Sequence, residues 1–201
     1  MSLDTFFDQL KHPNPNLRKM ARQEIAERRD EETIPRLMAN LEDEDMVYRR
    51  ASVKALGVIG LDAVPYLVEK LSNSDNATVR TSCAKALAQV AVNYPNETFP
   101  EEGIAGLSKG LQDEDAVVNL SSVMALGAVG NPAIEVLIAA LERNDNLAVG
   151  VAILNALGGI SDERVKQKLT QMSQDDSIDP YLKESAVSAL SRWEMVAKYN
   201  S

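Results

Sequence analysis

The chain has 201 residues, of which 45% are hydrophobic, 25% are charged and only 4% are aromatic. So few aromatic residues favour closely packed helices over a β-sandwich or barrel. The net charge of −9 argues against nucleic acid and anionic membranes as partners, because both bind basic surfaces.

In chain order, a short amphipathic segment at residues 2–11 is typical of a helix that caps an array. Six segments with a shared pattern follow it, at residues 14–41, 45–71, 76–111, 115–141, 146–172 and 179–199. The last is a longer and more polar helix that would close the other end. We therefore expect one domain over residues 1–201, built of about six helix-pair units.

Each unit contains an apolar anchor residue, which in most units is the leucine of an Ala-Leu pair. The anchors are Ile25, Leu56, Leu87, Leu126, Leu157 and Leu190, at intervals of 31, 31, 39, 31 and 33 residues. Unrelated helices would not keep this register, so the spacing predicts a repeat architecture. One helix pair cannot bury its apolar face alone, so the units must stack, and we expect an all-α, right-handed α-solenoid.

An Asn or Asp residue stands eleven positions before every anchor: Asn14, Asp45, Asn76, Asp115, Asn146 and Asp179. These residues are predicted N-caps, each stabilising its helix by ~1 kcal/mol. Glycines after the anchors, such as Gly60 and Gly130, predict helix ends and close helix approach. Nearby prolines, such as Pro65, predict the start of the second helix of a unit. The consensus Val/Tyr-Arg-x-x-Ala with Ala-Leu-Gly-x-Ile-Gly resembles HEAT-like repeats.

The third unit contains an insertion of about eight residues, within 93–103. Its aromatic residues Tyr94 and Phe99 are candidate partner-binding residues, because loops of repeat proteins often carry such contacts. The alternative is a tolerated insertion whose aromatic rings pack onto the solenoid.

Four units carry a basic residue seven positions before the anchor, namely Arg18, Arg49, Arg80 and Lys183. In HEAT-like arrays such an arginine pairs with a loop acid of the neighbouring repeat. Units four and five have Asn119 and Gly150 there instead.

The loss of that basic residue coincides with a segment, 147–160, that is apolar almost all round. A helix that is hydrophobic on every face should be buried on every face. In a solenoid its outward side is covered only if a partner binds there. We therefore predict a protein–protein interface on units four and five that includes Leu147, Val149 and Val151.

No catalytic or metal-binding motif is evident. The single histidine, His12, has no clustered carboxylates, and Cys83 falls on the core face of its predicted helix. The N-terminus does not have the pattern of a secretion signal, and no stretch looks long and apolar enough to span a bilayer. With one cysteine and no internal disulfide, a cytoplasmic protein is expected.

The segment 48–107 is similar to the phycobilisome-lyase HEAT-like repeat family, and 82–103 is the most diagnostic part because it covers the insertion. The short members resembled most are the small subunit of heterodimeric bilin lyases and the chaperone-like partner of phycoerythrin lyase. The resemblance implies a part in attaching a phycobilin to cysteines of a phycobiliprotein. It implies a phycobiliprotein subunit and a larger lyase subunit as partners, in the cyanobacterial cytosol near thylakoid phycobilisomes.

The resemblance also implies that the chain has no cofactor of its own but can hold a phycobilin transiently. The propionates of a bilin call for basic clamps, for which the candidates are Arg36, Arg49, Arg50 and Arg80. Aromatic residues to sandwich a pyrrole are few, which favours an assisting subunit. Two alternatives stay open. One is a catalytic lyase subunit in which an acid such as Glu69 protonates the bilin. The other is a generic HEAT-like scaffold, for example in phycobilisome turnover or iron–sulfur assembly.

Overall fold

The computed structural model describes residues 2–143 and 145–199, and within these ranges all regular structure is helical. The chain opens with α1 (Leu3–Gln9). Helix pairs follow: α2 (Pro15–Glu27) and α3 (Thr33–Ala39), α4 (Met46–Ile59) and α5 (Val64–Asn73), α6 (Ala77–Asn93) and α7 (Glu101–Gly110), α8 (Ala116–Val129) and α9 (Ile134–Arg143), α10 (Leu147–Leu157) and α11 (Glu163–Gln174). Helix α12 (Pro180–Tyr199) stands alone at the end. Short 3₁₀ turns lie at η1 (Asn40–Glu42), η2 (Gly60–Ala63) and η3 (Asn131–Ala133).

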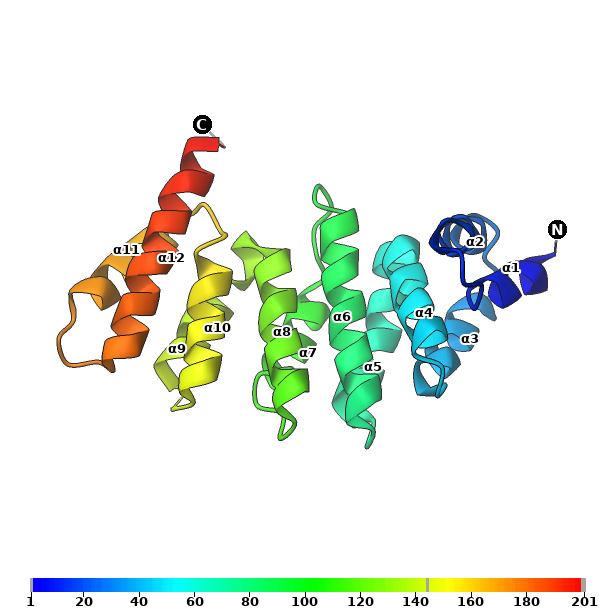
Figure 1. Ribbon diagram of the computed structural model, residues 1–201, viewed down its shortest axis with the longest axis horizontal. Coiled ribbons are helices and arrows are strands. Elements are labelled where there is room, and N and C mark those ends of the chain that lie inside the picture. Colours follow the sequence, from blue (N-terminus) through cyan, green and yellow to red (C-terminus); the bar gives the residue numbers. More distant parts are fainter. Residues whose placement is uncertain (1, 144, 200–201) are drawn as a thin grey trace.

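The helices form two layers along an elongated molecule with the termini at opposite ends (Figure 1). The first helices of the units, α4, α6, α8, α10 and α12, lie side by side and pack each against the next. We call this layer, together with α2, the first-helix layer. Helix α2 is seen almost end-on in Figure 1 and is therefore turned relative to the others. The predicted all-α solenoid is confirmed.

All six predicted Asx residues cap helices in the structure. The side chain of each accepts a hydrogen bond from the backbone N–H two residues further on. For Asp45, Asp115, Asn146 and Asp179 the N–H three residues on also donates to the same oxygen. These bonds satisfy N–H groups that have no partner inside the helix, so each cap fixes where a unit begins.

The anchor residues form the spine of one continuous core. Ile25, Leu56, Leu87, Leu126 and Leu157 are each 0% exposed. Leu190 is half-buried, because no further unit follows α12 within the described residues. A core that runs from unit to unit in this way is what a solenoid requires, since each pair covers the apolar face of its neighbour.

The predicted glycines do two separate jobs. Gly60 and Gly130 end α4 and α8 with φ of 87° and 77°, a region that favours glycine. Gly57 and Gly158 lie where helices meet closely. A Cβ at Gly57 would stand 2.3 Å from Cγ of Gln89 on α6, and one at Gly158 would stand 2.8 Å from the Ala189 carbonyl oxygen on α12. Both roles confirm the sequence-based expectation.

One helical segment of the described residues, Met46–Asn73, is long and apolar enough by composition to cross a membrane. The expectation that no stretch approaches this length was therefore wrong. The segment is α4, η2 and α5, and Gly60 interrupts it at its positive φ. Its most apolar window is 56% buried inside the protein, as expected for helices that build the core.

Candidate functional site

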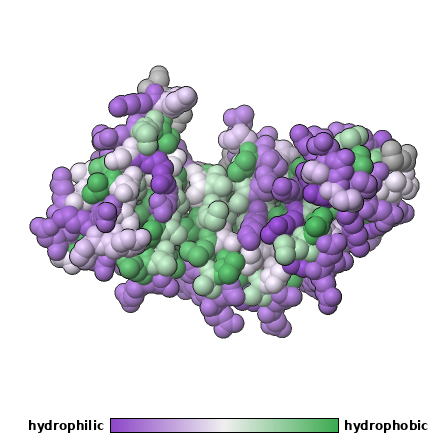
Figure 2. All heavy atoms as spheres, in the orientation of Figure 1, coloured by the Kyte–Doolittle hydropathy of each residue, from purple (hydrophilic) through white to green (hydrophobic). Residues whose placement is uncertain are grey.

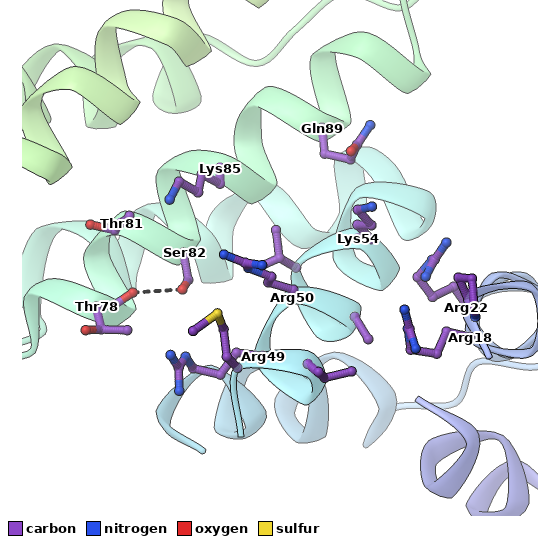
Figure 3. A pocket seen from close by; sticks show the side chains of 15 residues that line it. Arg18, Arg22, Arg49, Arg50, Lys54, Thr78, Thr81, Ser82, Lys85 and Gln89 are labelled. Atoms are coloured by element: carbon purple, nitrogen blue, oxygen red, sulfur yellow. Dashed lines mark hydrogen bonds between the residues drawn. The ribbon is translucent and has the colours of Figure 1, made fainter. Parts of the chain in front are cut away.

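A basic groove crosses the first-helix layer where α2, α4 and α6 meet, with a volume of about 680 Å³. We call it the basic groove. Its cationic lining residues are Arg18, Arg22, Arg49, Arg50, Lys54 and Lys85. No carboxylate lines it, although the chain as a whole carries a net charge of −9. Figure 3 shows Arg18 and Arg22 approaching from α2 and Lys85 from α6, on opposite sides of Arg50.

Most of these cations are not neutralised by the protein itself. Within the described residues the side chains of Arg22, Arg50, Lys54 and Lys85 have no hydrogen-bond or ion-pair partner. Burial and the nearby positive charge of Arg18 lower the pKa of Arg22. An unpaired cluster of this kind in a concave surface raises the local concentration of anions, carboxylates included.

The rest of the lining combines hydroxyl groups with a few apolar side chains. Thr78, Thr81 and Ser82 come from α6, and Ser82 Oγ donates to the Thr78 carbonyl oxygen at 2.7 Å. Met46 and Val47 supply apolar surface at the start of α4. No aromatic ring lines the groove, so it suits carboxylate groups better than the stacked binding of a flat ring system.

The four predicted propionate-binding arginines do not lie together. Arg49 and Arg50 line the basic groove, whereas Arg36 and Arg80 lie outside it. Arg36 donates to Asp4 at 2.5 Å and stacks 3.8 Å above the ring of Phe7. Each of these two arginines thus has a structural partner within the chain.

Arg80 makes the inter-repeat pair that the sequence predicted. Its Nε and Nη2 donate to the two carboxylate oxygens of Asp113, both at 2.8 Å, and its Nη1 donates to the Ser74 carbonyl at 2.9 Å. Asp113 raises the pKa of Arg80, chiefly through these hydrogen bonds, and the arginine lowers the pKa of Asp113 in return. Both side chains are 11% exposed, so this pair is a largely buried link between units three and four.

Sequence reasoning missed four groove residues: Arg18 as a groove cation, Arg22, Lys54 and Lys85. A signal was present. Arg18 and Arg22 are four residues apart on α2, and Arg50 and Lys54 are four apart on α4. Residues at this spacing share one helix face, so two neighbouring first helices each present a basic face.

The aromatic residues of the insertion face the protein. Phe99 is 7% exposed and packs against the position of Gly103. Tyr94 is half-buried, and its hydroxyl donates to the Val58 carbonyl at 2.5 Å. Asn93 Nδ2 donates to the Gly57 carbonyl at 2.9 Å. This is the arrangement of the alternative in which the insertion packs onto the solenoid.

The predicted interface residues on α10 have three different environments. Leu147 is 41% exposed, Val151 is half-buried and Val149 is 5% exposed within the core. Helix α8 adds an apolar row that the sequence reading did not single out, Val117, Leu120 and Met124, exposed by 55%, 36% and 71%. Figure 2 shows hydrophobic side chains gathered over the middle of this face, around α8.

The residues that could have indicated catalysis have structural roles. Cys83 is buried, and burial raises the pKa of its thiol to about 12, so it remains protonated and unreactive at neutral pH. His12 Nδ1 accepts the Asn14 backbone N–H at 3.0 Å, as part of the loop before α2. Among the described residues no three His, Cys, Asp or Glu side chains form a group that could hold a metal ion.

The stacked pairs and their capped, anchored first helices define an α-solenoid of the HEAT class. A protein-family model described as HEAT repeats matches residues 3–88 and 104–191. The unmatched stretch between these ranges, 89–103, contains the whole 93–103 segment with the insertion. A phycocyanin lyase complex of CpcE and CpcF from a Nostoc species supports the fold, with a TM-score of 0.52 at 20% identity over 77% of this chain and 96% of that one.

Two relatives show to which group of HEAT-repeat proteins the chain belongs. The chain is 50% identical to the uncharacterized phycocyanin operon protein Z of Pseudanabaena tenuis, over 99% of this chain and 98% of that protein. It is 35% identical to the bilin biosynthesis protein CpeZ of a Synechococcus species, over 81% of this chain and 90% of that protein. The chain therefore belongs to the HEAT-repeat family and, within it, to the phycobilisome-lyase group that the resemblance indicated.

Proposed function

We propose that the chain assists the covalent attachment of a phycobilin to cysteines of a phycobiliprotein, of the phycoerythrin type. It would do so by binding the phycobiliprotein subunit and a larger lyase subunit in the cytosol, beside the phycobilisomes. The relatives support this role, since CpeZ is named for bilin biosynthesis and covers nearly the same length of chain. The basic groove is the observation on which the proposal rests.

The groove offers the chemistry that such a role needs. A bilin carries two propionates, and surfaces of its acceptor protein carry further carboxylates. Arg49, Arg50 and Lys54 present positive charge from α4 toward the groove, where no internal acid competes. Guanidinium groups hold carboxylates through paired hydrogen bonds, which gives direction as well as affinity. The phycobilin would therefore be held transiently, and the chain would need no cofactor of its own.

An assisting role is favoured over a catalytic one by what lines the groove. A lyase step needs a group that donates a proton to the bilin. Glu69, the candidate for that role, is exposed on α5 in the other layer and does not line the groove. The thiol of Cys83 is protonated and buried. We therefore propose that the bond-forming chemistry is performed by the larger partner.

The proposal is tested by expressing the chain with a bilin-producing pathway and a phycoerythrin subunit, with and without the larger lyase. Bilin attachment, read by absorbance and by fluorescence of the protein band, should rise only when both proteins are present. The double variant Arg50→Glu with Lys54→Glu should remove most of that rise, because it reverses two charges in the groove. Lys109→Glu on α7 reverses one charge at an exposed site outside the groove and is the control.

Attachment by the chain alone would overturn the assisting role in favour of a catalytic lyase subunit. No effect under either condition would leave only the generic HEAT-like scaffold. A double variant that folds and assists as well as wild type would show that the groove is not the working surface.

A further inference from the structure

The arginine at the fourth position after the cap has the same backbone contact in three units. Arg18, Arg49 and Arg80 each direct Nη1 to the carbonyl oxygen of the residue six positions earlier, which precedes the cap by two. The side chain two positions before the cap also has the same local contact before units two, three and four. Asp43, Ser74 and Asp113 each accept a backbone N–H from the residue two further on. The repeats therefore place the same two positions in the same local geometry.

In unit three the remaining nitrogens of the arginine hold an acid of the next unit. Arg80 Nε and Nη2 bind the carboxylate of Asp113 with two bonds of 2.8 Å. Asp113 stands two residues before the next cap, Asp115. This pair shows which ligand the position binds in this fold: a carboxylate presented from the side of the following unit.

In unit two the corresponding acid is missing. The residue two before the next cap is Ser74, whose hydroxyl already accepts the Asn76 N–H at 3.2 Å. Arg49 keeps its backbone bonds to the Asp43 and Glu44 carbonyls through Nη1. Its Nε and Nη2 have no partner among the described residues. Helices α4 and α6 lie side by side as α6 and α8 do (Figure 1), so the vacant position is comparable.

The first unit does not offer the same vacancy. Asp43 occupies the position that would face Arg18, and its second carboxylate oxygen lies 3.9 Å from Lys11 Nζ. Helix α2 is turned relative to α4 (Figure 1), and Arg18 makes no ion pair with Asp43. Among the described residues, Arg49 is thus the one arginine of the three whose next first helix packs as α8 does on α6 and has no acid two residues before its cap.

We propose that Arg49 is a docking point for an acidic side chain of a partner protein, which takes the place at Arg49 that Asp113 takes at Arg80. Arg49 lines the basic groove together with Thr78 at the start of α6, so an external carboxylate can reach it. We favour a polypeptide over a pigment as the source of this carboxylate for two reasons. The carboxylate that Arg80 binds, that of Asp113, lies on a loop of the polypeptide itself. The groove also has no aromatic lining that would stack on a pigment. Charge complementarity with six groove cations selects an acidic segment.

The inference deepens the proposed function, since it names the chemistry of the partner segment at the same groove. The test introduces an acid of the chain itself at the position that faces Arg49. Ser74→Asp supplies the missing internal acid, whereas Ser74→Asn has a similar size without charge. Asn73→Asp adds the same charge on an exposed neighbouring residue. A fluorescein-labelled peptide of eight glutamates is the probe, measured by fluorescence anisotropy at low ionic strength, where exposed charges are little screened.

Ser74→Asp is expected to weaken peptide binding by about fivefold or more relative to both controls, the loss of one charge-assisted contact. It is also expected to raise the melting temperature by about 2–4 °C, because the introduced acid pairs with Arg49. Arg49→Gln should weaken the peptide to the same extent without the thermal gain, which keeps the test valid if Ser74→Asp folds poorly.

Peptide binding by Ser74→Asp that equals binding by the two controls would overturn the proposal. The proposal would also be overturned if Ser74→Asp weakened binding only of an open-chain tetrapyrrole with free propionates, and not of the peptide. The dimethyl ester of the tetrapyrrole is the control for that titration. Such a result would mean that Arg49 binds the pigment. Neither peptide nor tetrapyrrole titration measures bilin attachment. The coexpression assay can therefore contradict the proposed function while the peptide titration supports this inference. The peptide titration can likewise fail while the coexpression assay supports the proposed function.

Discussion

The side chain two residues before the next cap decides whether the repeated arginine forms an ion pair within the chain or keeps two of its nitrogens unpaired. Arg80 and Arg49 share helix position and backbone contact, and they differ in whether Asp113 or Ser74 stands on the next unit. The arginines themselves were visible in the sequence because they recur in register. Their different roles were not, because the eight-residue insertion shifts Asp113 out of the simple spacing from Arg80. Four of the six groove cations were likewise missed as site residues, since the lining comes from three helices.

Loss of the Arg80–Asp113 pair should cost the protein measurable stability. Asp113→Asn is expected to lower the free energy of unfolding by about 2 kcal/mol at pH 7, because a largely buried guanidinium loses its charged acceptor. Urea unfolding of wild type and variant measures this difference. Asp145→Asn, an exposed acid, is the control and should change stability by less than about 0.5 kcal/mol.

The same pair predicts how stability depends on pH. The pKa of Asp113 is lowered in the folded chain, so the pair stabilises fully above the ordinary value near 3.8. That stabilisation is lost as the pH falls through the lowered folded value. The gap between wild type and Asp113→Asn should therefore stay constant from pH 7 to about pH 5 and close in stronger acid. A gap that persists undiminished in acid would contradict the assignment.

The helices were the most predictable level of the structure. Asx caps, anchors and glycines occur at fixed offsets, and each offset has a local physical cause, so boundaries could be placed from one sequence. The exposure of individual side chains on α10 could not. Apolar residues occur all round that helix, and only packing against α8, α12 and α9 decides that Val149 is buried while Leu147 is not.

Close helix approach at the fifth unit gives a prediction at this level. Gly158→Ala should destabilise the protein by about 1–3 kcal/mol, because the added Cβ meets the backbone of Ala189 and must push α12 away. Gly159→Ala is a matched control one residue on, where the nearest atom is 3.4 Å away and no neighbouring helix is met. Thermal melting followed by circular dichroism compares the two. Equal melting temperatures would mean that α12 moves without cost.

Over the whole molecule, charge is segregated in a way that the net value conceals. A chain of net charge −9 carries a groove lined by six cations and no acid. The net charge therefore describes the average surface and gives no information on the groove. The apolar row on α8 is a second feature of the same first-helix layer. The layer thus combines a charged region with an apolar one, as protein-binding surfaces commonly do.

In a solenoid, the terminal units should unfold at a lower denaturant concentration than the central units. Trp193, the single tryptophan, lies on α12, is 9% exposed and donates from Nε1 to the Asp162 carbonyl at 3.1 Å. Helix α12 has a neighbouring first helix on one side only among the described residues. In urea, tryptophan fluorescence should therefore change at a lower concentration than circular dichroism at 222 nm. Coincident transitions would instead mean that all units unfold as one.

The bonds from Asn93 and Tyr94 to α4 bear on how tightly the groove can bind. They tie the end of α6 to the Gly57 and Val58 carbonyls, on two of the three helices that form the groove. Neighbouring repeats of a solenoid can otherwise twist and slide against each other. A groove whose walls are fastened together loses little freedom when it is occupied, so more of its interaction energy remains as affinity. The insertion thus fastens α6 to α4, so we expect the walls of the basic groove to move little when a ligand binds.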